Sequence, residues 1–428
     1  MRRKYRKTAA KSSRFVESNQ DCLNYQFSRE ELMSLLHSQL DNLATSMGRV
    51  IAMGMLEDEV VELCGKPGKH LTNRTMTRYG YDPGWIAMAG QKLAVERPRV
   101  RSTRGKGEIR LTRYAEMQAP DRMSRAVLKR MLRGVSSRNY EGAVDCAQEG
   151  FGVKKSSVSR ALKRSLAAEV RKLSNRRWDG VRFLVIYIDT TPYAGESMAA
   201  VMGITQRGDK HILGLRQGAT ENASVCKDLL EDLCERGVAP DVMTLFVLDG
   251  SKALRAAVDR VWGEYALVQR CQIHKRRNLE QYVNEVYWPE LGQRLNAAYQ
   301  ATDYEQALAS LRDTRSWLHG INPDAARSLE DGMAETLTVV RLQIPPLLRK
   351  TLSSTNSIES AFGSLEQITG RVTNWQPGAM RRRWCGGGLL HIEQHFNRVP
   401  GYRSLPQLMA TLDKLGRDKG LDCKTQVA

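Results

Sequence analysis

Two aspartates stand at equivalent places in the chain, each at the end of an apolar run. "RFLVIYID" ends at Asp189 and "LFVLD" ends at Asp249. Apolar runs of this length with β-branched residues are typical of buried strands. Ligands in open α/β sheets gather beyond the carboxyl ends of the strands, so the two carboxylates are expected to face one pocket. Carboxylate oxygens there suit a hard cation such as Mg²⁺, which also keeps water and phosphate ligands.

A third acid would complete such a site, and Glu335, Glu359 and Glu366 all follow the last predicted strand. Glu359 has the best context, because the polar run in "LRKTLSSTNSIESAF" predicts that a helix starts just before it. Asn356 lies three residues earlier on the same helix face and could hold Glu359 from behind. A capped helix with a solvated glutamate in its first turn is the alternative. The predicted apolar face of this helix comprises Ile358, Phe362 and Leu365.

Other residues near the acids could support a reaction. Thr190 and Thr191 follow the first aspartate and could position a water molecule. Cys271 and His274 form a Cys-x-x-His pair in "CQIHKRRN". A structural zinc site usually needs four ligands, and no second Cys/His pair stands at a suitable spacing. The pair is therefore not predicted to be a zinc site.

The elements that must position these residues begin near position 179. The order is three strands, a helix, a strand, a helix and a fifth strand, with "QRGD" as the hairpin turn between the second and third strands. This order predicts a mixed sheet with helices on its faces, an α/β domain. Residues 275–350 contain no strand-like run and read as an inserted helical module. A terminal helix is predicted over 386–398, and residues 401–428 are taken as a C-terminal tail.

The first part of the chain is basic and divides into two regions. Residues 1–75 are predicted to be a basic tail, over 1–25, followed by a helical region that could serve oligomerisation. Residues 76–118 are predicted to be a basic β-hairpin region around the turn "STRGKGE", where Arg99 and Arg101 could bind a phosphate backbone. The helical region carries a leucine stripe typical of core or of a seam with a partner helix, made of Leu32, Leu35, Leu36, Leu40 and Leu43.

Residues 119–178 resemble a helix-turn-helix unit. A helix over 141–149 is predicted to stop at glycines, and a second helix follows "GVKKSS" with small polar and basic side chains at its start. That arrangement is typical of helices that enter DNA grooves, although generic helical hairpins share it. The residues predicted to contact DNA here are Lys154, Lys155, Ser157, Ser159, Arg160 and Lys163.

Composition favours a nucleic-acid partner and gives no sign of a membrane. The chain of 428 residues has 66 Lys and Arg against 47 Asp and Glu, a formal net charge of +19. Lys and Arg neutralise phosphates and release counterions, although a basic surface also serves solubility. Eight cysteines include no Cys-x-x-Cys pair, and no apolar run reaches the roughly 18 residues needed to span a bilayer. A reduced, cytoplasmic protein is expected.

The motifs together resemble a DDE transposase of the Mutator type, in the branch found in bacterial insertion sequences. The matching pieces are "IDTT", "VLDGSKALRAAV", "RCQIHKRRNL", "SSTNSIES" and "FNRVPGYRSLPQL", with "ERPRVR" and "GVKKSSVSRAL" upstream, over roughly residues 75–412. The resemblance implies a ribonuclease-H-like catalytic domain over 179–274 and 351–400, interrupted by the helical insertion 275–350. It implies that Asp189, Asp249 and Glu359 bind two Mg²⁺ or Mn²⁺ ions, with Cys271 and His274 close by.

The resemblance also implies a reaction and partners. The enzyme would cut double-stranded DNA at the terminal inverted repeats of its mobile element with water and join the 3′-hydroxyls to target DNA. It would act as a homodimer or higher oligomer on DNA, in the bacterial cytoplasm at the nucleoid, and Lys275 and Arg276 are added to the predicted DNA contacts. Thr190 departs from the small residue usual after the first aspartate. A transposase-derived DNA-binding regulator without catalysis and a nuclease that cuts without joining are the alternatives.

Overall fold

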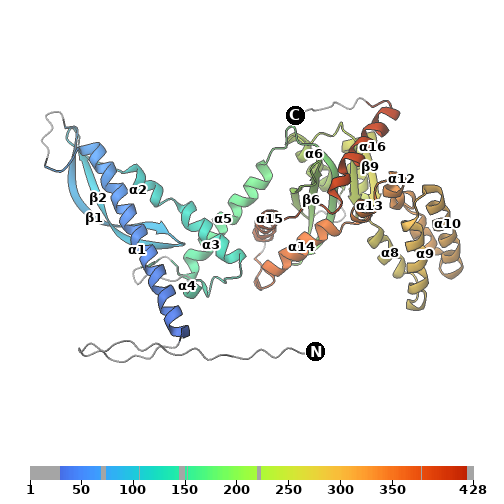
Figure 1. The fold of residues 1–428 in the computed structure, drawn as a ribbon, viewed down its shortest axis with the longest axis horizontal. Helices are drawn as coiled ribbons and strands as arrows, with labels where there is room; N and C mark the ends of the chain where they lie inside the picture. Colours follow the sequence, from blue (N-terminus) through green and yellow to red (C-terminus); the bar gives the residue numbers. More distant parts are fainter. Residues whose placement is uncertain are drawn as a thin grey trace, which may run out of the picture.

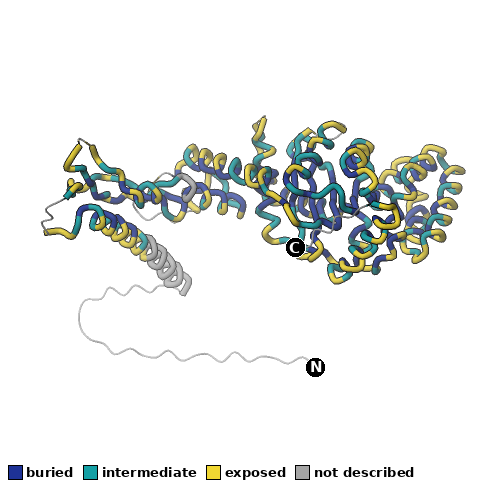
Figure 2. The backbone as a smooth tube through the Cα atoms, turned by 90° about the horizontal axis from the view of Figure 1, so that it is seen from above, coloured by how far each residue is buried: buried dark blue, intermediate teal, exposed yellow. Residues whose placement is uncertain are grey.

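The chain folds as a mixed α/β protein drawn out along one axis, as the sequence predicts at the level of fold class (Figure 1). The computed structural model describes residues 29–68, 74–105, 107–143, 150–151, 153–218, 223–376 and 378–421. A small sheet with a long helix lies at one end, and a larger sheet covered by helices lies at the other. Buried residues run continuously through the larger sheet (Figure 2). The described helices include none that is long and apolar enough to cross a membrane.

The N-terminal end is built from helix α1 (Arg29–Cys64) against an antiparallel hairpin, β1 (Met76–Met88) and β2 (Gln91–Ser102). The hairpin turns at Ala89 and Gly90, which both have positive φ, as a tight two-residue turn requires. Two short strands, β3 (Glu108–Ile109) and β4 (Gly150–Phe151), also pair with β2. The predicted basic hairpin is therefore present, but the long partner of β2 lies before it and not after "STRGKGE". The predicted tail over 1–25 lies outside the described residues.

A helical segment links the two ends of the molecule. It consists of α2 (Thr112–Met117), α3 (Pro120–Leu132), α4 (Tyr140–Ala143) and α5 (Lys155–Asn175). Helix α5 packs on α3 and on the later helix α15, and Leu173 near its end joins the core of the larger sheet. The helix predicted over 141–149 is described only as far as 143, and the rest lies outside the described residues.

The larger sheet follows the predicted succession of strands and helices. Its strands stand in the order β7-β6-β5-β8-β9; β5, β6 and β7 are antiparallel, and β8 and β9 run parallel to β5. The elements are β5 (Phe183–Tyr193), β6 (Glu196–Thr205), β7 (Lys210–Gln217), α6 (Ala223–Glu235), β8 (Thr244–Leu248), α7 (Lys252–Trp262), η1 (Gly263–Tyr265) and β9 (Ala266–Arg270).

The segment after β9 is helical throughout, as predicted, and has a core of its own. Apolar side chains of α9, α10 and α11 form that core, which is separate from the two cores on the faces of the larger sheet. Its elements are α8 (Gln272–Glu280), η2 (Glu285–Tyr287), α9 (Trp288–Gln300), α10 (Tyr304–Ile321), α11 (Pro323–Glu330), η3 (Ala334–Leu337), α12 (Thr338–Arg341) and α13 (Pro346–Leu352).

The chain then returns to the larger sheet through α14 (Asn356–Thr369), α15 (Met380–Glu393), η4 (Tyr402–Ser404) and α16 (Leu405–Asp418). Two predictions are wrong here. The helix expected over 386–398 begins six residues earlier and ends at Glu393. The segment taken as a tail contains α16, which lies on the sheet because its leucines recur at helical spacing and are fully buried. Those leucines are Leu405, Leu408 and Leu412.

Three consecutive glycines in α15 serve helix packing. A Cβ atom at Gly387 would lie 2.6 Å from a methyl carbon of Leu166 in α5, and one at Gly388 would lie 2.3 Å from Leu365 in α14. Side chains at these positions would push the helices apart, since contacts under about 3.0 Å do not occur between packed carbons. The glycine run thus lets α15 fit closely between α5 and α14.

Candidate active site

The two aspartates lie on neighbouring strands of the larger sheet. Asp249 directly follows β8 as predicted, whereas Asp189 lies inside β5, which continues to Tyr193, so the predicted strand end at Asp189 is wrong. Ile188 pairs with Leu248 in the parallel β5–β8 ladder, so Asp189 and Asp249 each follow a paired residue. Side chains alternate along a strand, and residues two and four before each aspartate belong to the core on the face that α14, α15 and α16 cover. Both carboxylates therefore leave the sheet at the same edge and toward the same face.

Glu359 comes from α14, which packs on β5 on that face. The predicted apolar side of α14 is buried, with Ile358, Phe362 and Leu365 each at most 2% exposed. This packing turns Glu359 toward the carboxyl ends of the strands. Its charge and that of Asp249 both raise the pKa of Asp189, which places the three carboxylates within electrostatic reach of one another. The three acids that the sequence predicts therefore lie on one side of the sheet, within electrostatic reach of one another.

Asp249 is fixed by the turn into α7. Its Oδ1 accepts a hydrogen bond of 2.8 Å from the backbone N–H of Ser251. The Ser251 hydroxyl in turn caps α7 by accepting from the N–H of Leu254. Gly250 between them has a φ of 107°, a conformation that favours glycine and explains the "DGS" sequence. The carboxylate is held with one oxygen still available.

Asp189 is 3% exposed and carries an unusual pKa. Burial raises its pKa to about 6, and the negative charge of Asp249 adds to the effect, while His274 opposes it. Desolvation and like charge both disfavour an ionised carboxylate. Thr191, two residues along the same strand face, contacts its Oδ2 at 3.4 Å. A buried carboxylate beside two further acids is a position that a bound cation would stabilise.

The Thr355 hydroxyl contacts Glu359, His274 and Cys271. This hydroxyl donates to Oε1 of Glu359 at 2.6 Å and lies 3.3 Å from Nδ1 of His274 and 3.4 Å from Sγ of Cys271. A hydroxyl has one proton, and the shortest contact shows that Glu359 receives it. Thr355 is fully buried, so these contacts hold Glu359 against α8.

Cys271 and His274 form a polarised pair behind Glu359. A hydrogen bond with Cys271 raises the pKa of His274 to about 9. Burial acts to raise the pKa of Cys271, but hydrogen bonds from His274 and Thr355 outweigh it and bring it below the usual value. The ligand atoms of Cys271, His274 and Glu359 lie within 4.8 Å of one another, while the Thr355 hydroxyl contacts all three. The Thr355 hydroxyl therefore links the three side chains.

The two other predicted supporting residues act differently from expectation. Asn356 is exposed at the start of α14 and makes no hydrogen bond to Glu359 among the described residues, because Thr355 holds that carboxylate instead. The side chain of Thr190 points to the opposite face of the sheet from Asp189, as strand alternation requires. It is the backbone of Thr190 that hydrogen-bonds Asp189 and moderates its pKa.

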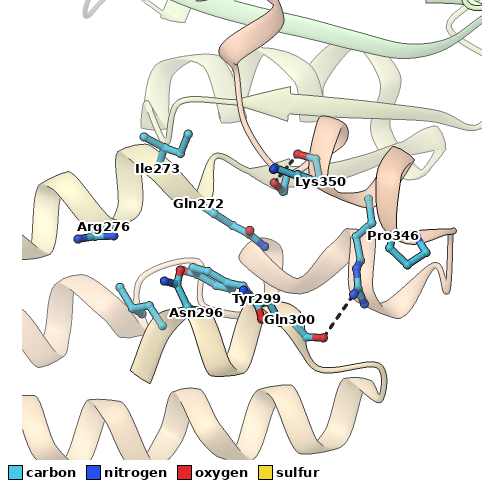
Figure 3. Close-up of a pocket in the computed structure, with 11 residues that line it drawn as sticks. Gln272, Ile273, Arg276, Asn296, Tyr299, Gln300, Pro346 and Lys350 are labelled. Atoms are coloured by element: carbon cyan, nitrogen blue, oxygen red, sulfur yellow. Dashed lines mark hydrogen bonds between the residues drawn. The ribbon is translucent and has the colours of Figure 1, made fainter. Parts of the chain in front are cut away.

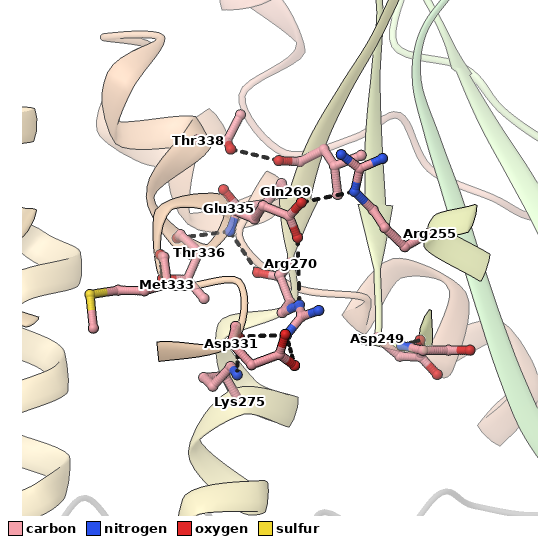
Figure 4. A network of polar contacts seen from close by, with 12 residues as sticks. Asp249, Arg255, Gln269, Arg270, Lys275, Asp331, Met333, Glu335, Thr336 and Thr338 are labelled. Atoms are coloured by element: carbon pink, nitrogen blue, oxygen red, sulfur yellow. Dashed lines mark hydrogen bonds and ion pairs between the residues drawn. The ribbon is translucent and has the colours of Figure 1, made fainter. Parts of the chain in front are cut away.

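Glu335 and Glu366 are not part of this cluster. Glu366 is exposed two turns further along α14. Glu335 accepts from Arg255 at 2.8 Å and pairs with Arg270, within the network that Figure 4 shows apart from Asp249. Arg270 also binds the carboxylate of Asp331, so the network ties β9 and α7 to the helical segment.

Lys275 was predicted to contact DNA, and this prediction is wrong. Lys275 is 4% exposed, and its ammonium donates to the carbonyl oxygens of Ser328 and Asp331, so it cannot reach a phosphate. Burial lowers its pKa to about 8. Arg276, on the next position of α8, is half-exposed and bonds to Glu280 at 2.7 Å. The helix periodicity separates the two residues that the sequence placed together.

The other predicted DNA contacts lie on the hairpin and on α5. Arg99 donates through Nε and Nη2 to the carboxylate of Glu108, and the guanidinium of Arg101 stacks 3.5 Å above the ring of Tyr79. Ser157 is half-buried in the first turn of α5. The other residues predicted on this helix are exposed on the face opposite its buried side, namely Lys154, Lys155, Ser159, Arg160 and Lys163.

Sequence reasoning missed Thr355 and Arg277, and it named Thr191 only as a residue that could position a water molecule. The guanidinium of Arg277 lies 3.9 Å from the second oxygen of Glu359. Thr355 could have been found, because it stands four residues before the acid and such residues are neighbours across one helical turn. Thr191 follows from strand alternation, which places it on the face of Asp189.

The fold and site together define a basic, elongated α/β protein with a carboxylate cluster at the carboxyl edge of its larger sheet. A family profile described as "Transposase, Mutator family" matches residues 21–370. The chain belongs to the Mutator family of transposases.

Curated relatives carry the same designation. The chain is 32% identical over 175 residues to a probable transposase for an insertion sequence element of Corynebacterium diphtheriae, a match covering 41% of this chain and 50% of the relative. It is 27% identical over 331 residues to the transposase for insertion sequence element ISRM5 of Rhizobium meliloti (strain 1021), covering 73% of this chain and 78% of the relative. The chain thus spans about half the length of the first of these relatives and over three quarters of the second.

Proposed function

We propose that this chain is an insertion-sequence transposase that cuts and joins DNA through Asp189, Asp249 and Glu359. The observation that carries the proposal is the convergence of the three acids at one edge of the larger sheet. Asp189 and Asp249 follow paired residues of β5 and β8, and Glu359 faces them from α14. Three antiparallel strands followed by two parallel ones support a ribonuclease-H-like catalytic domain over 179–274 and 351–400, with 275–350 inserted.

The donor set fits two Mg²⁺ or Mn²⁺ ions. Hard cations prefer carboxylate oxygens, and burial together with the nearby charge of Asp249, which a cation would neutralise, raises the pKa of Asp189. Bound ions would activate the attacking oxygen and stabilise the leaving oxygen of the phosphodiester. The protein would hold Asp249 through the Ser251 backbone. Thr355 would hold one oxygen of Glu359, and the ion would take the other oxygen, which lies 3.9 Å from Arg277.

The proposed substrate is double-stranded DNA, with the terminal inverted repeats bound by the N-terminal region. Helix α5 presents an exposed basic face from Lys154 to Lys163, while its other face packs on α3, which supports a helix-turn-helix role for 119–178. Two ends must meet for joining, so the proposed active form is a homodimer or larger.

The test compares Glu359→Gln with Glu366→Gln, a matched change seven residues later on the exposed side of α14. Purified protein is incubated with Mg²⁺ and labelled DNA that carries the ends of its element. Nicked and joined products are expected from wild type and Glu366→Gln and none from Glu359→Gln. Cut products that are never joined would indicate a nuclease. Tight end binding without products from any of the three proteins would favour a DNA-binding regulator.

A further inference from the structure

A cleft of about 420 Å³ opens beside the candidate active site, between α8, α9 and α13 (Figure 3). The cleft is not lined by any of the three candidate acids, and the proposed cutting and joining reaction does not use it. Its apolar lining residues are Ile273, Leu295 and Pro346. The polar and charged lining residues are Gln272, Arg276, Asn296, Tyr299, Gln300, Arg349, Lys350 and Ser353.

The charge of the cleft is one-sided. It is lined by Arg276, Arg349 and Lys350, and none of the described residues that line it is acidic. Arg349 donates to the carbonyl oxygens of Ala301 and Gln300, which fixes one wall. Lys350 is exposed, and its ammonium has no hydrogen-bond or ion-pair partner among the described residues. Such a lysine suits a phosphate.

The other lining groups suit a nucleobase. Asn296 and Gln300 lie one helical turn apart on α9, and both are exposed. Primary amides both donate and accept hydrogen bonds, as the edges of bases do. Tyr299, partly exposed between them, supplies a flat aromatic side chain against which a ring can stack. Phosphate and base groups of one nucleotide could be bound at once.

The wall of the cleft is continuous with the catalytic cluster. Gln272 directly follows Cys271, and its backbone N–H donates to the carbonyl of Ser353 at 2.9 Å. Ser353 stands two residues before Thr355, which holds Glu359. The Gln272 side chain is anchored on the carbonyl of Thr336 at 2.8 Å. A strand that passes the acids would reach this cleft without leaving the protein surface.

We propose that the cleft binds one nucleotide of the DNA strand that passes the candidate acids. Its phosphate would lie at Lys350, and its base against Asn296, Gln300 and Tyr299. The choice of a DNA strand rests on the proposed function, whereas the nucleotide chemistry rests on the cleft itself. A free nucleotide would use the same groups, so the experiment must separate the two sources.

The experiment is photo-cross-linking of the full chain to element-end DNA carrying 4-thiothymidine at single positions, in EDTA so that no cleavage is required. Cross-linked peptides are expected from 288–300 and 346–353. Asn296→Ala should lower this cross-link at least fivefold, and Gln293→Ala, an exposed amide on the same helix outside the cleft, should not. Lys350→Ala should reduce the salt slope of DNA binding by about 1, as loss of one phosphate contact does. Arg312→Ala, exposed on α10, should leave the cleft cross-link unchanged.

Two results would overturn the inference. One is cross-linking confined to other parts of the chain, with Asn296→Ala and Lys350→Ala equal to their controls. The other is a deoxynucleoside monophosphate that binds alone in the cleft and abolishes the cross-link, because this would make a free nucleotide the ligand. Cleft cross-links from a protein that yields no products with Mg²⁺ would refute the proposed catalysis and leave the nucleotide site standing.

Discussion

Asp189 illustrates how a single side chain can lower the stability of a fold that it serves. Its pKa is raised from 3.8 to about 6 by burial and by Asp249. The folded state therefore binds its proton more tightly than the unfolded state, and this stabilisation is present below pH 3.8 and is lost as pH rises through about 6. Above that pH the ionised carboxylate destabilises the metal-free protein by about 2–3 kcal/mol.

Asp189→Asn is accordingly expected to raise the melting temperature in EDTA at pH 7.5, where the wild-type carboxylate is ionised. The gain should shrink toward pH 4.5. Added Mg²⁺ should raise the melting temperature of wild type and leave that of Asp189→Asn unchanged, since ligand binding stabilises only a competent site. Thermal unfolding of both proteins, with the exposed Asp313→Asn as control, measures this. A lower melting temperature for Asp189→Asn in EDTA would contradict the assignment.

Thr355 is a positioning residue in the proposed mechanism, because it acts through Glu359. Thr355→Val keeps the shape but removes the hydroxyl that donates to Glu359 at 2.6 Å. Loss of a group that orients a metal ligand typically lowers activity or metal affinity by about 10–100-fold. The expected result is a cleavage rate that needs more Mg²⁺ for half-saturation, with recovery in Thr355→Ser.

The control for this prediction is Thr369→Val, another buried threonine of α14, whose hydroxyl donates to the carbonyl of Leu365. It should lower stability without changing the Mg²⁺ dependence of cleavage. If both valine variants showed the wild-type Mg²⁺ dependence, Thr355 would have only a structural role.

Residue types and positions in strands predicted the acids, but they could not predict which partners hold them. Asp189 and Asp249 were singled out because each interrupts a long apolar run, although only Asp249 directly follows its strand and β5 continues past Asp189 to Tyr193. Lys275 and Arg276 were both predicted to contact DNA, because the sequence shows the charge of a side chain but not the direction in which it points. A rotation of about 100° per residue along α8 sends one into the protein and the other to its surface. Burial of a lysine depends on carbonyl groups over 50 residues away in the chain.

At the scale of elements, α5 divides into a face that packs and a face that is free. Val158, Ala161 and Leu162 are buried, whereas Arg160 and Lys163 are exposed one turn apart. The double change Arg160→Ala with Lys163→Ala should weaken binding of end DNA and lower its salt slope by about 1.8, from two lost phosphate contacts. Fluorescence anisotropy across a series of salt concentrations measures the slope.

The matched control removes equal charge from the other end of the same helix, through Arg171→Ala with Lys172→Ala. These residues are also exposed, but they lie beyond the proposed contact surface, and Lys172 is paired with Glu169. Equal slopes for the two double variants would mean that α5 contributes only general charge and does not read DNA through its first turns.

Elements with a uniform pattern were predictable, and elements defined by distant contacts were not. The larger sheet follows from its apolar runs, and the insertion follows from its lack of strand-like runs. Strand β1 was missed as the partner of β2 because "MTRYGYDPGWIAM" contains glycine and proline, which weaken a strand pattern. Helix α16 was missed because a short amphipathic segment near a chain end has no local signal that distinguishes docking from a free tail.

At the scale of the whole molecule, the N-terminal end shows an apolar surface that no other part of the described chain covers. Helix α1 spans 36 residues and uses Ala52, Leu56 and Val60 to pack on the hairpin. Another side of it stays exposed, from 46% to 69%, at Leu43, Met47, Val50, Ile51 and Met55. Beside Ile51 and Met55 lies a groove of about 290 Å³ that includes Met88 and Met117.

The occupant proposed for this surface is α1 of a second copy. Leu43, Met47 and Val50 follow the alternating spacing of four and three that is typical of a seam between two helices. The stripe continues in the sequence through Leu40 and Leu36, which also lie on α1. A helix with such a stripe matches another copy of itself, and joining two DNA ends requires two active sites to be held together.

Val50→Glu with Ile51→Glu is therefore expected to convert a dimer into a monomer in sedimentation velocity, because each carboxylate would be buried without a partner at the seam. The monomer should still bind one DNA end and cut it poorly, with joined products reduced at least tenfold because paired ends no longer form. Val286→Glu, which places the same charge at a valine 80% exposed on the insertion, should leave the mass unchanged. If the double variant stayed dimeric, the contact between the two copies would lie elsewhere. If the wild type were monomeric even on paired DNA ends, α1 would form no contact with a second copy.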